Sequence, residues 1–417
     1  MYHTQETGAF VPFCETVIRR YSSFRELPPH NVMDPKLLHG EIYLTLTART
    51  PVIVSGGKSI HEGDVRISLF ATDAYGRYRI PGSSLRGLIR QNMQILGLGL
   101  VRVGREDEIP AKPALANRRH PADGLPQSYR IPEDQDFLDY VRSIMGFVGR
   151  KHSVPKRNGG TKLVSDCYRT RISVGDLRAV GTTKELHTVL LQQELPQQDS
   201  DRFIIRENGS FRLKGTRQYP LREVSQNQSY LSKQGFRPLA AGTQFTGTIR
   251  YRNLHADELG LLLWCLRLEE GCLHTMGMAK AAGYGQMELK IDSLVEYEPA
   301  QLYSSLTSSG IRRGETGQRI DALIRAYRSY AAEQSGIHPT SLLEMPHIRT
   351  FLKLKGWQPQ TEDQTAAVTS KPAAPSKPPA PSQKELRRKA KKEAKPQASA
   401  QEVSSWKAML SDKYKSN

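Results

Sequence analysis

Three short segments of this sequence combine glycine, serine and basic residues in patterns that can hold a phosphate group. In the first, IPGSSLRGLIR, Gly82 permits a tight turn and Ser83 or Ser84 can cap the helix that follows. Backbone amides at a helix N-terminus bind anions. Arg86 and Arg90 lie four residues apart and form a basic stripe on that helix. Many strand–turn–helix junctions have only a structural role, so the motif alone leaves both interpretations open.

The second segment, HTMGMAKAAGYGQMELKI, is rich in glycine. Gly277, Gly283 and Gly285 surround Lys280. Glycine lets a backbone approach a polyanion closely, and the lysine ammonium supplies a point charge. Enzymes that hydrolyse nucleotides often have a phosphate-binding loop with a GK[ST] signature, and this signature is absent from the segment. We therefore expect no nucleotide cofactor.

The third segment, FRLKGTRQY at residues 211–219, mixes basic and aromatic side chains. Arg212, Lys214 and Arg217 lie between Phe211 and Tyr219. Basic residues can bind the phosphates of a single-stranded nucleic acid while aromatic rings stack on its bases. An irregular surface loop explains the same spacing equally well.

Hydrophobic periodicity predicts the elements that position these segments. Residues 41–47 alternate apolar and polar side chains, which is typical of a half-buried strand. A helix after Gly82 has apolar residues at helical spacing and should bury Leu85, Leu88, Ile89, Met93 and Leu96. A strand at 242–254 precedes a second helix, which Asn253 can cap and which should bury Leu259, Leu262, Leu263 and Leu266. A closing strand contains Met287, Leu289 and Ile291.

These elements form two strand–helix–strand units separated by a turn-rich middle segment. The pattern predicts an α+β fold with a ferredoxin-like core and a sheet that leaves one face open for RNA. A helix containing Ile320, Leu323, Ile324 and Tyr327 should pack on this core or on a neighbouring subunit.

The composition of the chain favours a nucleic-acid-binding protein and argues against membrane, secreted and zinc-binding proteins. The chain has 417 residues, 60 lysines and arginines against 42 acidic residues, and a formal charge of +18, which favours a polyanionic partner such as nucleic acid. The longest apolar run, 259–266, is far shorter than the roughly 20 residues of a membrane-spanning helix, and the N-terminus does not resemble a secretion signal. Four cysteines without a CxxC pair argue against a zinc knuckle and a disulfide framework. We therefore expect a cytoplasmic protein with no membrane partner.

The C-terminal segment differs from the rest of the chain. Residues 361–417 begin with a stretch rich in proline, alanine, serine and lysine, followed by the basic run KELRRKAKKEAK. Such a composition cannot bury a core, so it predicts a disordered tail. The basic run can hold phosphates without sequence preference, or it can be a solvated tail that keeps the protein soluble.

Taken in order, several motifs resemble the RAMP superfamily of CRISPR-associated proteins. They are IPGSSLRGLIR, RTRISVGD, GTQFTGTIRYRNLHADELGLLLWCL and GMAKAAGYGQMEL. They look most like the backbone subunits of type III effector complexes. GEIYLTLTARTPVIV and LKGTRQY are similar to one RAMP branch found in type III loci. The resemblance covers roughly residues 38–295.

The resemblance implies a ferredoxin/RRM-like subunit that binds guide RNA beside sibling subunits in a prokaryotic cytoplasm, with target RNA and other effector subunits as further partners. Gly82, Ser83, Ser84, Arg86 and Arg90 would face guide phosphates. The glycine-rich loop of the superfamily would consist of Gly277, Lys280, Gly283 and Gly285.

It also implies a division of the chain. Residues 1–37 would be an N-terminal extension, followed by a core in two parts, 38–100 and 236–298. Between the two parts, 101–235 would be an insertion with thumb-like elements that interrupt the guide–target duplex. A helical segment, 299–357, and the tail, 358–417, would complete the chain.

In related backbone subunits an aspartate before the equivalent helix cleaves target RNA with a divalent metal. By position, Asp64 matches best, with His61 and Glu62 close by, and Asp73 is the second choice. A carboxylate can hold Mg²⁺ or another divalent cation and help to align the ribose 2′-OH with its phosphate. An aspartate beside glycine is also a common turn residue, and some backbone subunits do not cleave, so the sequence leaves the enzymatic activity open.

Two other functions fit parts of the sequence. The RAMP endoribonucleases that process precursor guide RNA use histidine as an acid or base, and His39, His61 or His274 are the candidates here. Those enzymes usually lack so long an insertion and a basic tail. A general RNA-binding module outside any CRISPR complex is the other alternative, which the absence of an RNP-type aromatic signature disfavours.

Overall fold

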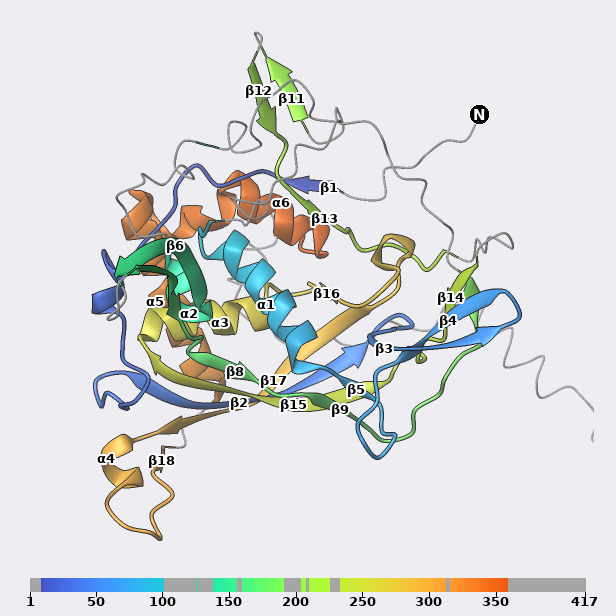
Figure 1. Ribbon diagram of the computed structural model, residues 1–417, viewed down its shortest axis with the longest axis horizontal. Coiled ribbons are helices and arrows are strands. Elements are labelled where there is room, and N and C mark those ends of the chain that lie inside the picture. Colours follow the sequence, from blue (N-terminus) through green and yellow to red (C-terminus); the bar gives the residue numbers. More distant parts are fainter. Residues whose placement is uncertain are drawn as a thin grey trace, which may run out of the picture. The chain divides into compact units, whose positions relative to one another are not determined.

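The computed structural model describes residues 9–100, 126, 138–155, 160–190, 204–207, 210–225, 233–312 and 316–358 (Figure 1). Within these ranges the chain is an α+β protein, which confirms the predicted fold class. The predicted tail at 361–417 lies outside the described residues, as does the start of the predicted insertion, residues 101–125.

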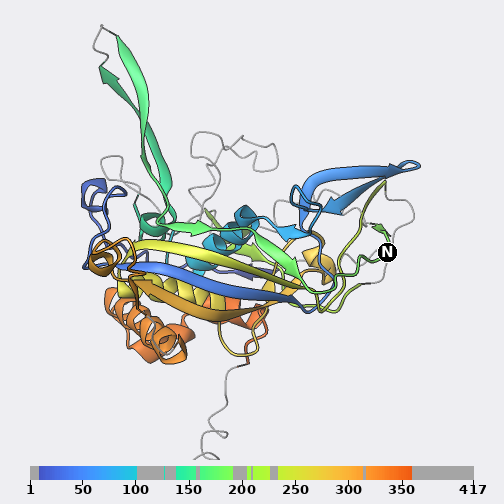
Figure 2. The same cartoon turned by 90° about the horizontal axis from the view of Figure 1, so that it is seen from below.

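The largest sheet of the described residues has eight strands, all paired antiparallel. β16, β17, β2, β15, β9 and β5 lie side by side in that order, while β18 pairs with β17 and β8 pairs with β15. The bounds are β2 Leu38–Ala48, β5 Arg79–Ile80, β8 Ile172–Val174, β9 Leu177–Val180, β15 Gln244–Leu254, β16 His274–Thr275, β17 Gln286–Tyr297 and β18 Ile311–Arg312. Figure 2 shows the three long strands β2, β15 and β17 in blue, yellow and orange.

Helices cover one face of this sheet, as Figure 1 shows. They are α1 Gly82–Leu96, α2 Tyr140–Met145, α3 Ala256–Arg267, α5 Thr316–Ser335 and α6 Pro346–Leu354. On β2 the residues Ile42, Leu44 and Leu46 are buried beneath the helices, whereas Tyr43 is exposed on the opposite face. The period-two pattern at 41–47 therefore predicted both the strand and its buried side correctly.

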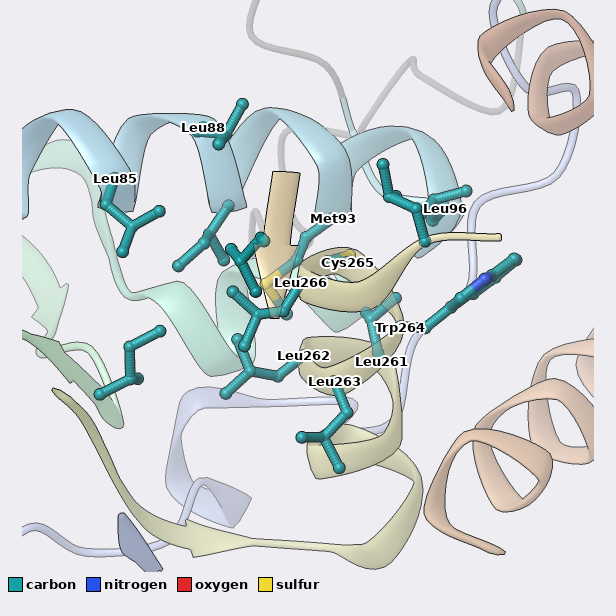
Figure 3. Close-up of a cluster of buried hydrophobic side chains, with 14 of the residues drawn as sticks. Leu85, Leu88, Met93, Leu96, Leu261, Leu262, Leu263, Trp264, Cys265 and Leu266 are labelled. Carbon is teal, nitrogen blue, oxygen red and sulfur yellow. The ribbon is translucent and has the colours of Figure 1, made fainter. Parts of the chain in front are cut away.

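The buried face predicted for α1 is confirmed, because all five of its apolar residues are buried. Figure 3 shows α1 packing on α3 through leucine and methionine side chains. α3 is buried on more sides than predicted, and Leu261, Trp264 and Cys265 are also fully buried. One reason is α5, which packs against α3 and places the Tyr327 ring beside Trp264. A Cβ atom on Gly260 would lie 2.0 Å from the Leu323 carbonyl oxygen, so glycine allows this close approach.

Both predicted helix caps are wrong. The N-cap of α1 is Pro81, whereas Ser83 and Ser84 lie in the first turn, so neither is a cap. The N-cap of α3 is His255. Asn253 has a positive φ of 53°, and its side chain donates to the carbonyl oxygens of Pro29 and Val32, so it anchors the N-terminal segment to the sheet.

The range 101–235 contributes to several parts of the fold. β8 and β9 come from it and pair with β15 of the central sheet. A hairpin of β6 and β7, drawn in green, extends away from the sheet in Figure 2. A second sheet has the order β10-β14-β4-β3. The bounds are β3 Ser55–Glu62, β4 Val65–Phe70, β6 Phe147–Pro155, β7 Thr161–Tyr168, β10 Val189–Leu190 and β14 Gln234–Phe236.

The remaining elements are short. Strand β1 pairs with β13, and β11 pairs with β12. The bounds are β1 Ala9–Val11, η1 Phe24–Glu26, β11 Ile204–Glu207, β12 Ser210–Leu213, β13 Thr216–Gln218, η6 Lys280–Ala282, α4 Pro299–Leu302 and η7 Pro339–Glu344. The helix predicted around residue 323 is α5, and its four predicted core residues are buried. Every helix in the described ranges is too short or too polar to cross a lipid bilayer.

Candidate nucleic-acid interface

The first turn of α1 is already bound by a carboxylate. The backbone amide of Gly82 donates to Asp176 Oδ1 at 2.8 Å. This hydrogen bond and the neighbouring Arg79 guanidinium hold the pKa of Asp176 below its usual range. A Cβ atom on Gly82 would lie 2.3 Å from the Val174 carbonyl oxygen. Gly82 therefore allows close packing of α1 on β8, and its amide is not available to a phosphate.

The basic stripe of α1 contacts protein carbonyl groups. Arg86 donates to the Met145 carbonyl oxygen at 2.9 Å, and Arg90 donates to that of Gly146 at 2.7 Å. Both arginines therefore hold the C-terminal end of α2 on α1. Arg86 remains exposed alongside this contact, as does Ser83, so this part of the predicted phosphate surface still faces solvent.

The glycine-rich loop has the backbone conformation that its glycines predict. Gly277, Gly283 and Gly285 have φ values of 87°, 85° and 73°, which side chains other than glycine rarely adopt. A Cβ atom on each would lie 2.4 Å or less from a backbone oxygen, namely those of Ile53, Glu223 and Met276. These glycines thus permit close packing within the chain, and their close approach to a polyanion stays a prediction.

The structure brings the second and third basic segments together at Tyr219. The Lys280 Nζ lies 5.6 Å from the centre of the Tyr219 ring, and the Arg217 guanidinium carbon lies 5.5 Å from it. Both distances are in the range of cation–π interactions. Lys280 also donates to the Gly277 carbonyl oxygen at 2.6 Å. Two segments about 60 residues apart therefore form one basic and aromatic cluster, Arg217–Tyr219–Lys280.

The other two basic residues of the third segment have different surroundings. The Lys214 Nζ lies 5.9 Å from the centre of the Phe10 ring. Arg212 is exposed on β12, in the hairpin at the top of Figure 1. The Phe211 side chain lies outside the described residues.

The open face of the central sheet carries charges of both signs. Arg250 donates to Glu41 at 2.7 Å, and Arg49 pairs with Glu288. The Thr45 hydroxyl donates to Asp292 at 2.7 Å. Because these basic groups already have acidic partners, the face is poorly suited to a polyanion.

Asp64 lies at the tip of the β3–β4 hairpin. The turn has a positive φ of 57° at Gly63, and both Asp64 and the neighbouring His61 are exposed. Glu62 is paired with Arg237. The Asp64 carboxylate is therefore accessible to solvent. The Glu62 carboxylate is already neutralised by the Arg237 guanidinium.

The second catalytic candidate, Asp73, closes a turn. Its Oδ1 accepts hydrogen bonds from the amides of Tyr75 at 2.9 Å and Arg77 at 3.0 Å, while Oδ2 pairs with the Arg77 side chain at 2.8 Å. These contacts saturate the carboxylate, so the structure favours a turn role for Asp73.

The described residues do not fit a divalent metal held by the protein alone. No group of three or more histidine, cysteine or acidic side chains in them could hold a metal ion. At the β3–β4 tip only Asp64 offers a carboxylate without a basic partner among the described residues. Mg²⁺ takes several oxygen ligands, and a single carboxylate cannot supply them.

Two of the three histidines proposed for guide processing are buried and bonded on both ring nitrogens. His274 donates to the Leu266 carbonyl oxygen at 2.7 Å and accepts from the Asn92 amide at 3.3 Å. Burial lowers the pKa of His274 to about 4. His39 contacts the Asp34 carbonyl oxygen and accepts from the Asn253 amide, and burial lowers its pKa as well. Both positions suit a neutral structural histidine better than an acid or base.

Sequence reasoning missed a buried ion pair beside α3. Arg171, 3% exposed, binds both carboxylate oxygens of Glu258 at 2.5 and 2.7 Å and donates to the Asn253 carbonyl oxygen. Glu258 also accepts from the His255 amide at 2.9 Å. The two charges are 87 residues apart, and no local pattern in the sequence marks them as partners.

Sequence reasoning also missed the buried residue Lys355. It follows directly after α6, and only 1% of it is exposed. Its Nζ donates to the Thr275 hydroxyl at 2.8 Å, so it lies against β16, directly before the glycine-rich loop. A lysine after an amphipathic helix ordinarily faces solvent, and the sequence gives no sign of this burial.

No protein-family model matches this sequence, and no curated protein is significantly similar to it.

Proposed function

We propose that this chain is a guide-RNA-binding backbone subunit of a type III CRISPR ribonucleoprotein in the prokaryotic cytoplasm. The observation that carries the proposal is the Arg217–Tyr219–Lys280 cluster, where two segments selected from the sequence for phosphate binding meet. The cluster offers two cations and one aromatic ring, the combination that suits a single-stranded RNA backbone and its bases.

The strand order supports a ferredoxin-like RAMP core. Along the chain, β2, α1, β8 and β9, β15, α3 and β17 make a βαββαβ sequence. In the sheet, β17 and β15 flank β2, and β8 and β9 lie beyond β15. A split βαβ arrangement of this kind is the ferredoxin-like motif. The proposal uses the fold only as support, because a fold can host many functions.

Binding in this proposal depends mainly on charge. Lys280 and Arg217 attract phosphates, and the Tyr219 ring stacks on a base, so recognition does not require a particular sequence. The β6–β7 hairpin is the thumb-like element we assign to the guide–target duplex, because it extends away from the sheet. Sibling subunits and target RNA are the remaining partners of the proposal.

Target cleavage at Asp64 is a separate proposal. What supports it is accessibility, since Asp64 lies at an exposed hairpin tip. Asp73 is less suited, because its carboxylate is saturated by its own turn. The guide-processing alternative is weaker, because His39 and His274 are buried and bonded.

Fluorescence anisotropy with a labelled single-stranded RNA tests the binding proposal. Lys280→Met and Tyr219→Ala should each weaken binding, and Lys280→Met should also reduce the slope of log affinity against log salt by about 1. Lys36→Met, which removes an exposed charge elsewhere, is the matched control. Equal affinity of all four proteins, or salt-independent binding by the wild type, would contradict the proposal.

A further inference from the structure

The turn between β4 and β5 carries a tyrosine whose side chain is almost wholly exposed. Tyr75 is 85% exposed, whereas tyrosine rings in proteins are ordinarily at least partly buried. Covering an aromatic face that is in contact with water is favourable. The turn leads into β5, an edge strand of the central sheet, so a ligand can approach the ring from solvent.

Hydrogen bonds to Asp73 hold the backbone of this turn. The Asp73 amide donates to the Arg77 carbonyl oxygen at 2.9 Å, and the Gly76 amide donates to the Asp73 carbonyl oxygen at 3.1 Å. The Asp73 carboxylate accepts from the amides of Tyr75 and Arg77 at 2.9 and 3.0 Å. Gly76 has a φ of 78°, which glycine adopts without strain. Because the turn is fixed before a ligand arrives, binding to Tyr75 costs little ordering of the backbone.

Arg77 lies over the ring of Tyr75. Its guanidinium carbon is 5.3 Å from the centre of that ring, within the range of cation–π interactions. The Asp73 carboxylate fixes this position, because Arg77 donates to it through Nε and Nη2, both at 2.8 Å. The third guanidinium nitrogen, Nη1, has no hydrogen-bond partner among the described residues, and the side chain is 54% exposed. The turn therefore presents an aromatic face and a guanidinium donor to solvent.

Two further arginines lie on the strands beside this turn. Arg79 of β5 and Arg178 of β9 are partners in the strand pairing. Arg79 donates to the carbonyl oxygen of Thr72, directly before the turn, at 3.1 Å and pairs with Asp176. Arg178 is exposed and forms no ion pair with a described residue. Three arginines against two aspartates give this edge of the sheet a net positive charge, which favours a polyanion.

We propose that the β4–β5 turn is a second RNA contact, in which one base of a single strand stacks on the open face of Tyr75 and the adjoining phosphate binds Arg77 Nη1. Every base has a flat aromatic face, so such a contact needs no particular sequence. This inference rests on the proposed RNA-binding function, and it adds a site on a segment outside the Arg217–Tyr219–Lys280 cluster. In this site the Asp73 carboxylate holds the turn that presents the ring.

The anisotropy of a fluorescein-labelled 40-nucleotide single-stranded RNA with the full-length chain tests this contact. Tyr75→Ala should lose about five- to tenfold in affinity, the low end of the usual effect of one stacked base. Tyr75→Phe keeps the ring and should bind as the wild type does. Tyr303→Ala is the matched control, because it removes another exposed tyrosine ring, 72% exposed, at the end of α4. Arg77→Met should reduce the slope of log affinity against log salt by about 1.

Photocrosslinking gives a second readout that does not depend on affinity. Iodouridine-substituted RNA, irradiated in complex with the wild-type chain, should crosslink to the peptide that contains Tyr75, as identified by mass spectrometry. Wild-type affinity in Tyr75→Ala, an equal loss in Tyr303→Ala, or RNA bound without a crosslink at Tyr75 would overturn the turn site alone. An unchanged salt slope in Arg77→Met would overturn its phosphate contact. No RNA binding by the wild-type chain would overturn both the site and the proposed function.

Discussion

The backbone amide of Gly82 donates a 2.8 Å hydrogen bond to the carboxylate of Asp176. An acidic side chain thus occupies the first turn of α1, where the helix dipole favours negative charge. Asp176 also pairs with Arg79 of β5, so it ties the start of α1 to the edge of the sheet. RNA that approaches this end of α1 meets a carboxylate before it meets the backbone amides.

Removing this charge should strengthen RNA binding. Asp176→Asn keeps an oxygen acceptor for the Gly82 amide and removes the negative charge. We expect affinity for single-stranded RNA to rise about two- to fivefold, the usual effect of one charge at a helix end. Anisotropy at low salt measures the change. An unchanged affinity would mean that RNA does not contact the start of α1.

Asp176 also sets a pH dependence of stability. Because its pKa is lower in the folded protein than in the unfolded chain, its contribution is present above the unfolded pKa, near 4, and is lost as pH falls through the folded pKa. In acid, Asp176→Asn should therefore lose less of its stability than the wild type. A parallel decline of both proteins in urea titrations would contradict this.

The Arg171–Glu258 pair should be essential for stability. Glu258→Gln leaves a buried guanidinium without its counter-charge, and we expect a loss of about 3–5 kcal/mol in the free energy of unfolding. The exposed pair Arg349–Glu344 is the control, and Glu344→Gln should cost less than about 1 kcal/mol. Urea denaturation measures both, and similar losses in the two variants would refute the buried pairing.

His274 should make the protein less stable in mild acid. Its folded pKa of about 4 lies below its unfolded value of 6.5, so the unfolded state binds more protons between these values. Stability is full above about pH 6.5 and falls as pH drops towards 4, by roughly 2–4 kcal/mol. In His274→Gln this part of the pH dependence should disappear, whatever that variant's stability at pH 7. Identical slopes for both proteins would rule out a neutral, buried His274.

Asp64→Ala tests the cleavage proposal. In the assembled complex, the variant should bind target RNA as the wild type does and leave it uncut, because the candidate carboxylate is gone. Cleavage is mapped at single-nucleotide resolution with and without a metal chelator. Asp73→Ala should behave differently, because it removes the hydrogen bonds of a turn, so we expect a lower melting temperature. An intact cleavage pattern in Asp64→Ala would remove Asp64 from the reaction.

Local patterns predicted the elements of this fold better than its polar contacts. The 3.6-residue repeat of α1 and the alternation of β2 identified buried faces correctly, because burial follows directly from those periods. The Gly82–Asp176 and Arg171–Glu258 contacts join residues 94 and 87 positions apart. Only the folded arrangement of β8, β9 and α3 brings them together.

For the glycine-rich loop too, the sequence predicted the local conformation but not the contacts made in the fold. The sequence correctly marked positions that need glycine, and Gly277, Gly283 and Gly285 do have positive φ angles. It could not show that the neighbours of these glycines are backbone oxygens of the same chain. Lys355 was missed because its burial depends on β16 and the preceding residue Leu273 lying against the end of α6, which no local pattern encodes.

Recovery of the chain from cells that naturally express it, followed by sequencing of the bound RNA, tests the central proposal most directly. We expect small RNAs with spacer-derived sequence, and we expect far fewer of them with Lys280→Met than with Lys36→Met. Recovery of sibling CRISPR subunits with the wild-type chain, but no spacer-derived RNA, would contradict the proposal that this protein binds guide RNA.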